Sequence, residues 1–374
     1  MVIQKMKRTE REIYFLLVLV SIASSQQFYI PVYFERIYGD AELAFILFTI
    51  AVALRAFLAP FIAQILKNFI KLNIIVAFSF QSLFYILLYL KIPINFKLAF
   101  ILGAFYGIAS SLILFLNAVY FSYSEPTFSS RYKSANFFIS SKFIGYTIGS
   151  TISAIILFFY NLADILIIAS IFWLSSIPLV FTLNVEKTEV KKPSLGKVKE
   201  SLFLVPLPLL ISFVFSMSLA SVGGIIEPLI FNKINAGWFS ISFILANIAS
   251  SLVPIYFPKN KIKLSLALGT FLAVITEFLF PLTPFLYLLI IYGILSQVGN
   301  SLVWPVAIGK IVSKSKFPVV ESGVLITLTD ISSLIADGYV SLSFPLINVL
   351  SLSLFSIIDL FSWLPLLLSK IDVQ

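Results

Sequence analysis

The chain of 374 residues contains no cysteine and no histidine. These absences exclude disulfides, thiolate chemistry and the usual ligand sets for zinc and haem. The sequence also has no Gly-x-x-x-x-Gly-Lys-Ser/Thr phosphate loop and no Gly-x-Ser-x-Gly elbow, so it offers no site for ATP hydrolysis or serine-type acyl transfer. We therefore expect no cofactor, no resident metal and no enzymatic activity.

Charged residues are scarce, at 11% of the chain, whereas 60% are hydrophobic and the mean hydropathy is +1.04. Soluble globular proteins contain about 45–50% apolar residues, and a membrane-crossing helix needs about 20 of them in succession. This composition predicts an all-α membrane protein with twelve transmembrane helices. The expected spans are 12–34, 42–66, 72–90, 98–121, 134–159, 163–183, 201–229, 238–257, 264–280, 285–309, 319–343 and 346–368. The ninth is short, which leaves open whether it crosses completely.

The lysines and arginines fix the expected orientation, because cytoplasmic loops retain these residues and translocated loops do not. Of the 26 in the chain, Arg55 and Lys142 fall inside spans. The loops of one side hold only Arg36, Lys91, Lys97 and Lys233. We therefore predict a multi-pass protein of the cell membrane with both termini in the cytoplasm. The net charge of +9 reflects the lysines and arginines of the cytoplasmic loops and does not indicate a nucleic-acid partner.

A polar, charged segment, NVEKTEVKKPSLGKVKE at 184–200, divides the expected spans into two sets of six. FYGIASSLILF at 105–115 and IYGILSQVGNS at 291–301 repeat a pattern in the fourth span of each set. We predict two pseudo-symmetric six-helix bundles, at 1–184 and 201–374, joined by a cytoplasmic linker at 185–200.

Three segments carry a resemblance to a known family. The loop after the second span reads PFIAQILKNFIKLN, the loop after the fourth reads SEPTFSSRYKSANF around Arg131, and the fifth span contains GYTIGSTISA at 145–154. They are similar to signature segments of the major facilitator superfamily of secondary transporters, and the resemblance covers nearly the whole chain. Lys67 stands where the family has an aspartate, so the gating role of that aspartate is not carried over. Ser150 replaces the proline of the family's export motif, so export is not indicated.

The resemblance implies the family's fold and its alternating access, with spans one, four, seven and ten lining a central cavity. It also implies that spans two and eleven lie side by side across the halves and that spans five and eight meet there. Gly145, Gly149 and Ser153 share one helix face, which favours close backbone packing over an export signature.

Polar side chains at helical spacing suggest a wet cleft, because such a stripe would be unsatisfied against lipid. Serine and threonine often bond to their own helix and carry little information. Carboxamides are more costly to bury without a partner. The candidate substrate-binding residues are Gln26, Gln27, Asn117, Gln297, Asn300 and Trp304.

Ionisable groups deep inside spans are candidates for coupling or gating. We single out Arg55, Glu227, Asp330 and Asp337. Arg55 and Asp330 lie at similar depth, at roughly 18 Å from the cytoplasmic ends of their spans, and we expect them to pair in one access state. Arg55 could instead anchor an anionic substrate or pair with another acid. We assign structural roles to Glu277 and Asp359, and we expect Lys142 to extend toward the inner interface.

The sequence thus favours a secondary active transporter that moves a small organic solute by alternating access. Coupling to a proton or another ion, and uniport, are both compatible with it. We expect a monomer whose partners are its small-molecule substrate and membrane lipid. The alternatives are a permease subunit or non-transporting scaffold and, with less support, a membrane-embedded enzyme, since the acids are scattered singly over several spans.

Overall fold

The computed structural model describes residues 8–123, 128–183, 207–232, 234–256, 262–312, 318–343 and 351–368, and these residues contain helices and no strand. The N-terminal half comprises α1 (Arg8–Ser24), η2 (Ser25–Tyr29), α2 (Ile30–Tyr38), α3 (Glu42–Ile65), η3 (Lys67–Phe69), α4 (Ile70–Tyr89), α5 (Phe96–Ser111), α6 (Leu114–Ser122), α7 (Phe128–Phe159) and α8 (Asp164–Val180). The C-terminal half comprises α10 (Leu207–Asn232), α11 (Ala236–Tyr256), α12 (Ile262–Leu279), η6 (Phe280–Leu282), α13 (Leu286–Val312), α14 (Pro318–Ser343) and α15 (Ser351–Leu368).

Each span expected from the sequence coincides with a helix or with short helices in succession. Within the described ranges, nine helical stretches are long and apolar enough to cross a membrane, and the ninth expected span is among them as Lys263–Leu282. The helices of the sixth, eighth and twelfth expected spans contain shorter apolar stretches, at Asp164–Val180, Gly237–Val253 and Leu352–Phe361. The all-helical class is confirmed, whereas the count of twelve and the pseudo-symmetry stay predictions.

The first expected span is interrupted by the tight turn η2, whose sequence is SQQFY. Pro31, at the start of α2, has no N–H, and its ring would clash with the carbonyl four residues earlier in a regular α-helix. The chain tightens into a 3₁₀ turn before this proline. As a result, Gln26 and Gln27 project toward different neighbours.

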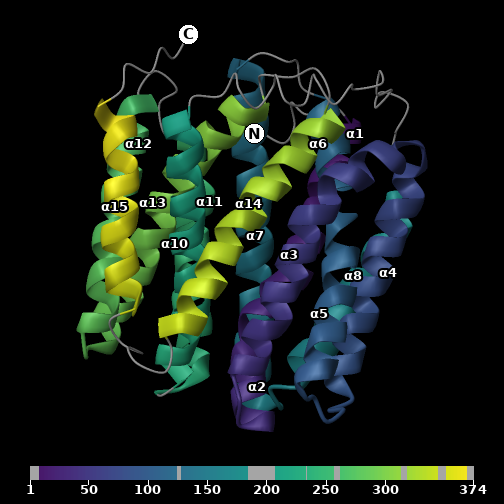
Figure 1. Cartoon of the computed structure of the whole chain (residues 1–374), viewed down its shortest axis with the longest axis horizontal. Helices are drawn as coiled ribbons and strands as arrows, with labels where there is room; N and C mark the ends of the chain where they lie inside the picture. The colour runs from purple at the N-terminus through teal and green to yellow at the C-terminus, as the bar shows by residue number, and fades with distance from the viewer. Residues whose placement is uncertain are drawn as a thin grey trace.

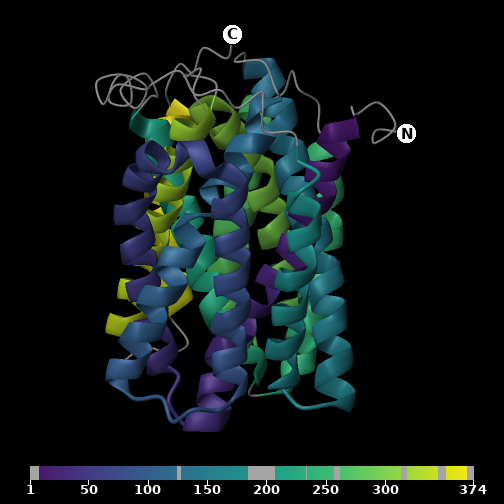
Figure 2. The same cartoon turned by 90° about the vertical axis from the view of Figure 1, so that its right-hand side faces the viewer.

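The helices run roughly parallel to one another, as two perpendicular views show (Figures 1 and 2). In Figure 1, α10, α12, α13 and α15 stand on the left, α3, α4, α5 and α8 stand on the right, and α14 crosses obliquely between them. α1 begins and α15 ends on the same side of the molecule. We call the opposite end, where α2 and α10 end, the outer end, because the charge pattern predicts that it faces away from the cytoplasm.

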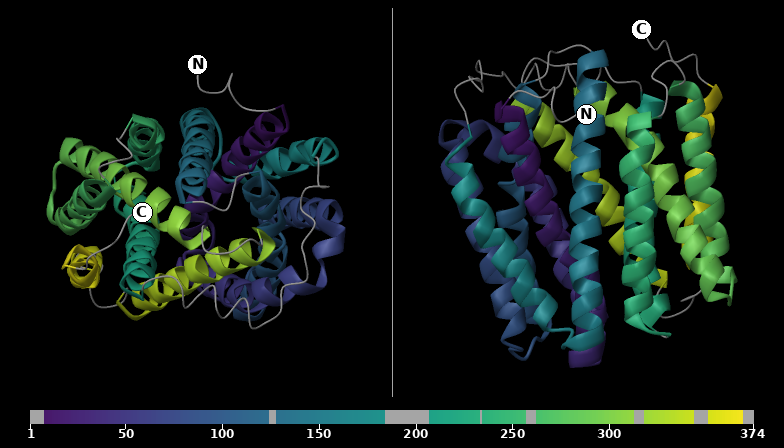
Figure 3. Two further views of the ribbon diagram at one scale, coloured as in Figure 1. Left: turned by 90° about the horizontal axis from the view of Figure 1, so that it is seen from above. Right: turned by 180° about the vertical axis from the view of Figure 1, so that it is seen from behind.

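The two halves meet along a few helices that cross near the centre of the molecule, seen from above in Figure 3. α3 packs against α14, and α7 packs against α11 and α13. These are the neighbours that the resemblance implied for spans two and eleven and for spans five and eight. The expected linker at 185–200 lies outside the described residues, so the division of the chain there stays a prediction.

Inside the N-terminal half, α7 packs on α1 and η2 at backbone distance. A Cβ atom at Gly145 would lie 2.4 Å from Ser21 Cβ and 2.5 Å from the Val18 carbonyl, and one at Gly149 would lie 2.0 Å from Ser25 Oγ. Only glycine fits at either position. The small-residue face predicted for packing is confirmed, and its partner is α1 with η2 in the same half.

Large apolar side chains cover much of the outer surface of the bundle. Phe57 is 66% exposed, Phe159 is 78% exposed and Phe271 is 61% exposed, on three different helices. Soluble monomers rarely expose apolar patches of this extent. The surface therefore suits a lipid environment.

Candidate substrate and coupling site

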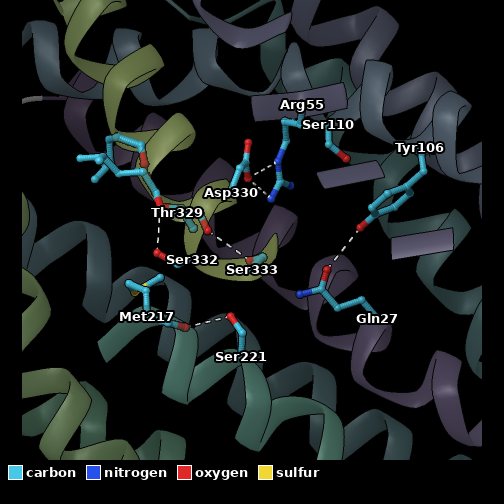
Figure 4. A network of polar contacts seen from close by, with 12 residues as sticks. Gln27, Arg55, Tyr106, Ser110, Met217, Ser221, Thr329, Asp330, Ser332 and Ser333 are labelled. Carbon is cyan, nitrogen blue, oxygen red and sulfur yellow. Dashed lines mark hydrogen bonds and ion pairs between the residues drawn. The ribbon is translucent and has the colours of Figure 1, made fainter. Parts of the chain in front are cut away.

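Arg55 and Asp330 join the two halves through an ion pair near the middle of the molecule (Figure 4). Arg55 Nε on α3 donates to Asp330 Oδ1 on α14 at 2.7 Å, and Arg55 Nη2 contacts the same oxygen. The Asp330 side chain is fully buried, whereas that of Arg55 is 24% exposed. The pairing expected from equal depth in the sequence is thus present in the structure, and its role in gating stays a prediction.

The ion pair has a second acid nearby. Asp337 lies two turns after Asp330 on α14, is 4% exposed, and interacts electrostatically with Arg55. Asp330 Oδ2 has no hydrogen-bond donor among the described residues. Arg55 therefore faces two carboxyl groups on one helix and satisfies only part of their hydrogen-bonding capacity.

Lys142 is the second cation near the centre of the molecule. Its Nζ lies 4.7 Å from the centre of the Phe138 ring, which favours a cation–π contact. Lys142 and Arg55 are also close enough to repel one another. Phe138 precedes Lys142 by one turn on α7, toward the start of the helix, so the expectation that Lys142 extends toward the inner interface stays a prediction.

Three candidate substrate-binding residues of α13, Gln297, Asn300 and Trp304, share one helix face. Gln297 Oε1, both polar side-chain atoms of Asn300, and Trp304 Nε1 are buried without a hydrogen-bond partner among the described residues. Leaving such a group unpaired costs about 1–3 kcal/mol. The Trp304 ring stacks on Phe143 of α7, with 6.2 Å between ring centres and 13° between planes. The face therefore lies at the junction of the halves and has polar groups ready for a ligand.

The two glutamines of η2 have different roles. The Gln26 amide nitrogen donates to Ser25 Oγ at 3.0 Å and to the Gly149 carbonyl at 3.2 Å, and its Oε1 accepts from Ser153 at 2.5 Å. These bonds hold α7 in place, so we reassign Gln26 from substrate binding to helix packing.

Gln27 points toward the centre instead, and its Oε1 accepts from the Tyr106 hydroxyl of α5 at 3.2 Å (Figure 4). Asn117 of α6 is half-buried, in a helix that contacts α14. Tyr106 also interacts electrostatically with Arg55, which sequence spacing did not reveal. Tyr106, an aromatic residue that the sequence also places on a cavity-lining span, thus lies beside Gln27 and Arg55 in the candidate site.

Glu227 does not join the Arg55–Asp330 pair. It faces Glu277 of α12, the acid for which the sequence suggested only a peripheral, structural role. Glu277 is 2% exposed and belongs to the interior of the C-terminal half. Its position near the end of an apolar run gave no sign that Glu227 would meet it.

A hydrogen-bonded contact joins the halves at the outer end. Arg36 of α2 donates from Nε and Nη2 to Asn232 Oδ1 at 3.1 and 2.6 Å, and Asn232 Nδ2 donates to Glu35 Oε2 at 2.9 Å. Deeper in the molecule, Tyr29 and Ser240 share a hydrogen bond of 2.6 Å. We call the contact of Glu35 and Arg36 with Asn232 the outer latch. Nothing in the sequence pointed to it, because its partners are far apart in the chain.

No group of three or more His, Cys, Asp or Glu side chains that could hold a metal ion occurs within the described residues. The candidate site is therefore an ion pair with a second acid, a second cation, and unpaired carboxamide and indole groups. Such a set can bind a polar organic molecule.

In sequence, the chain matches no model of a known protein family and no curated protein. In structure, it is similar to the human organic anion transporter MFSD10 (TETRAN), with a TM-score of 0.68 and 13% identity over 97% of this chain and 99% of that one. It is also similar to a bacterial homologue of the iron transporter ferroportin in the outward-facing state, without and with soaked iron. The TM-score is 0.64 in each case, at 15% identity over 95% of this chain and 99% of that one. The fold is that of a membrane transporter. At these identities the likeness concerns the fold alone.

Proposed function

We propose that the chain is a secondary transporter that carries a small organic solute across the cell membrane by alternating access. The Arg55–Asp330 ion pair is the observation that carries this proposal. It lies at the junction of α3 and α14, which belong to different halves of the chain. An ion pair in this place opposes separation of the halves until another group replaces one of its members.

The substrate would bind between this ion pair and the polar face of α13. Asn300 is fully buried and its carboxamide has no partner among the described residues. A substrate that hydrogen bonds to this carboxamide would therefore relieve the cost of its unpaired polar atoms. Arg55 and Lys142 make an organic acid the first substrate class to examine. The fold similarity to an organic anion transporter also favours testing organic acids first.

The test is a thermal-shift screen of the purified protein with organic acids, sugars, amino acids and amphipathic drugs, because binding stabilises the folded state whatever the coupling. We expect one class to raise the melting temperature of the wild type and of Asn247→Leu, but not of Asn300→Leu. Asn247 is the matched control, since it is equally buried and bonds to the Phe243 carbonyl of its own helix.

Asn300→Leu by itself should keep or raise the stability of the protein, by about 1 kcal/mol, because it removes unpaired polar atoms. Uptake of the identified compound into vesicles then tests transport. If no class shifts the melting temperature and vesicles show no uptake, the scaffold or permease-subunit alternative replaces this proposal.

A further inference from the structure

Two glutamates of the C-terminal half face one another away from the Arg55–Asp330 pair. Glu227 of α10 and Glu277 of α12 lie close enough for their carboxyl groups to interact. The Ser296 hydroxyl of α13 donates to Glu277 Oε1 at 2.5 Å. Glu277 is 2% exposed, and its Oε2 receives no hydrogen bond from a donor in the described part of the chain. Ionised carboxyl groups can only accept hydrogen bonds, so a hydrogen bond between the two needs a proton on one of them.

The backbone around the two carboxyl groups is shaped to admit them. Gly223 lies one turn before Glu227 on the same face of α10, and a Cβ there would lie 3.0 and 3.1 Å from the carboxyl oxygens of Glu277. A Cβ at Gly293 of α13 would lie 2.9 Å from Ser242 Oγ and 4.0 Å from Glu227 Oε2. A larger residue at Gly223 would displace the Glu277 carboxyl group. The pair therefore occupies a notch between α10, α12 and α13.

No cation balances these acids within the described helices. Glu227 and Glu277 interact with each other, and Glu277 also accepts from the Ser296 hydroxyl. Neither glutamate shows an electrostatic interaction with Tyr292 of α13 or with Asp330 and Asp337 of α14. The species that would neutralise the repulsion of two adjacent carboxylates must therefore come from solution.

We propose that Glu227 and Glu277 form a proton-binding site that holds one proton between the two carboxyl groups. One group carries the proton as an O–H and donates it to a carboxylate oxygen of the other. Release of the proton to water leaves two carboxylates side by side, which repel one another. Both residues lie near the outer ends of their helices, so the proton exchanges with the outer side.

The surrounding helix can convert this repulsion into movement. Pro228 directly follows Glu227 and has no N–H, so the Gly224 carbonyl lacks its regular donor. Beyond this weak point, α10 ends at Asn232, which forms the outer latch with Glu35 and Arg36. Loss of the proton would push α10 away from α12 and loosen the latch. This coupling role rests on the proposed transport function, whereas the proton site itself does not.

The test is infrared spectroscopy of the purified full-length protein, titrated from neutral to alkaline pH, with the proton as the only ligand. We expect the wild type to show the stretching band of a protonated carboxyl group that disappears on alkalinisation. Glu227→Gln and Glu277→Gln should each remove the band at neutral pH, because the remaining carboxyl group no longer stands beside a carboxylate. Glu42→Gln, which removes an exposed carboxyl group at the start of α3, should leave it unchanged.

Ser296→Ala keeps both acids and removes a donor to Glu277, so the band should persist to higher pH than in the wild type. This variant provides a second test in case the glutamine variants misfold. It should extend the band to higher pH, whereas the glutamine variants should remove the band. A band that survives both glutamine substitutions, or that depends on Glu227 alone, would overturn the shared proton. Since this measurement needs no substrate, a band that behaves as expected in a protein without uptake would refute the transport proposal and keep the proton site. Uptake by a protein that shows no such band would refute the proton site and keep the transport proposal.

Discussion

The two halves of the chain place opposite charges inside the bundle. In the N-terminal half, the ionisable side chains near the centre are the cations Arg55 and Lys142, and the neutral Gln26 forms the main polar network between helices. Among the described residues of the C-terminal half, the buried charged side chains are the acids Glu277, Asp330, Asp337 and Asp359, and Glu227 is partly buried.

This difference separates two kinds of electrostatic contact. A charge in one half can be neutralised by the other half only where the halves touch, as Arg55 neutralises Asp330 across α3 and α14. In the proposed transport cycle, such a contact breaks when the halves separate. Acids deeper in the C-terminal half, such as Glu227 and Glu277, are out of reach of those cations and depend on a proton. The position of an acid relative to the junction thus decides which partner it has.

The largest expected effect comes from removing Arg55. Arg55→Ala leaves the carboxylate of the fully buried Asp330 without its cation, which should lower the free energy of unfolding by about 3 kcal/mol. Asp330→Ala should have a smaller effect, because Arg55 is partly exposed and can reach water. Thermal unfolding in detergent measures both, with Lys97→Ala in the exposed first turn of α5 as the control.

The charge exchange sharpens this prediction. Arg55→Asp combined with Asp330→Arg should recover part of the stability and of the transport lost in the single variants, since the pair is rebuilt with reversed polarity. Additive losses in the double variant would mean that the two residues act separately. If only the Arg55 variants lost binding of an organic acid, Arg55 would instead be the anchor of an anionic substrate.

Close packing in the N-terminal half predicts an intermediate effect. Gly145→Ala places a methyl group against Ser21 and the Val18 carbonyl, and should lower stability by about 1–3 kcal/mol. The same change at Gly338 of α14 meets nothing within 4 Å and should raise stability by about 0.5–1 kcal/mol through helix propensity. Equal changes in melting temperature for the two variants would contradict the tighter packing around Gly145 than around Gly338.

The outer latch predicts the smallest effect, because its charged groups are exposed. With a reporter thiol introduced by Ser240→Cys, Asn232→Ala should speed labelling from the outside by about two- to fivefold. The chain has no native cysteine, so the background is clean. Asn161→Ala, at an exposed turn of the same end, is the matched control. Unchanged labelling in Asn232→Ala would show that the latch does not hold the outer end closed.

Much of the helix pattern was readable in the sequence, whereas the partners of polar side chains were only partly so. The pair of Arg55 with Asp330 could be predicted because a charge in an apolar run needs a partner at its own depth, and the family resemblance named the neighbouring helix. Gln26 and Gln27 looked alike, since nothing in the pattern showed that Pro31 would tighten the chain into η2 and turn them to different helices. The meeting of Glu277 with Glu227 could not be predicted, because the rotation of α12 toward Glu227 leaves no trace in hydropathy.

The sequence alone determined the membrane environment, the helical class and the depth of each charged residue, because these follow from local composition and from the rise of 1.5 Å per residue. The tertiary structure decided which groups meet. It placed Asp330 against a cation of the other half and Glu227 against a second acid, although both are carboxylic acids within apolar helices. The physical reason is that the partner of a buried charge is set by helix rotation and by close backbone approach, as at Gly223, and these depend on packing between segments far apart in the chain.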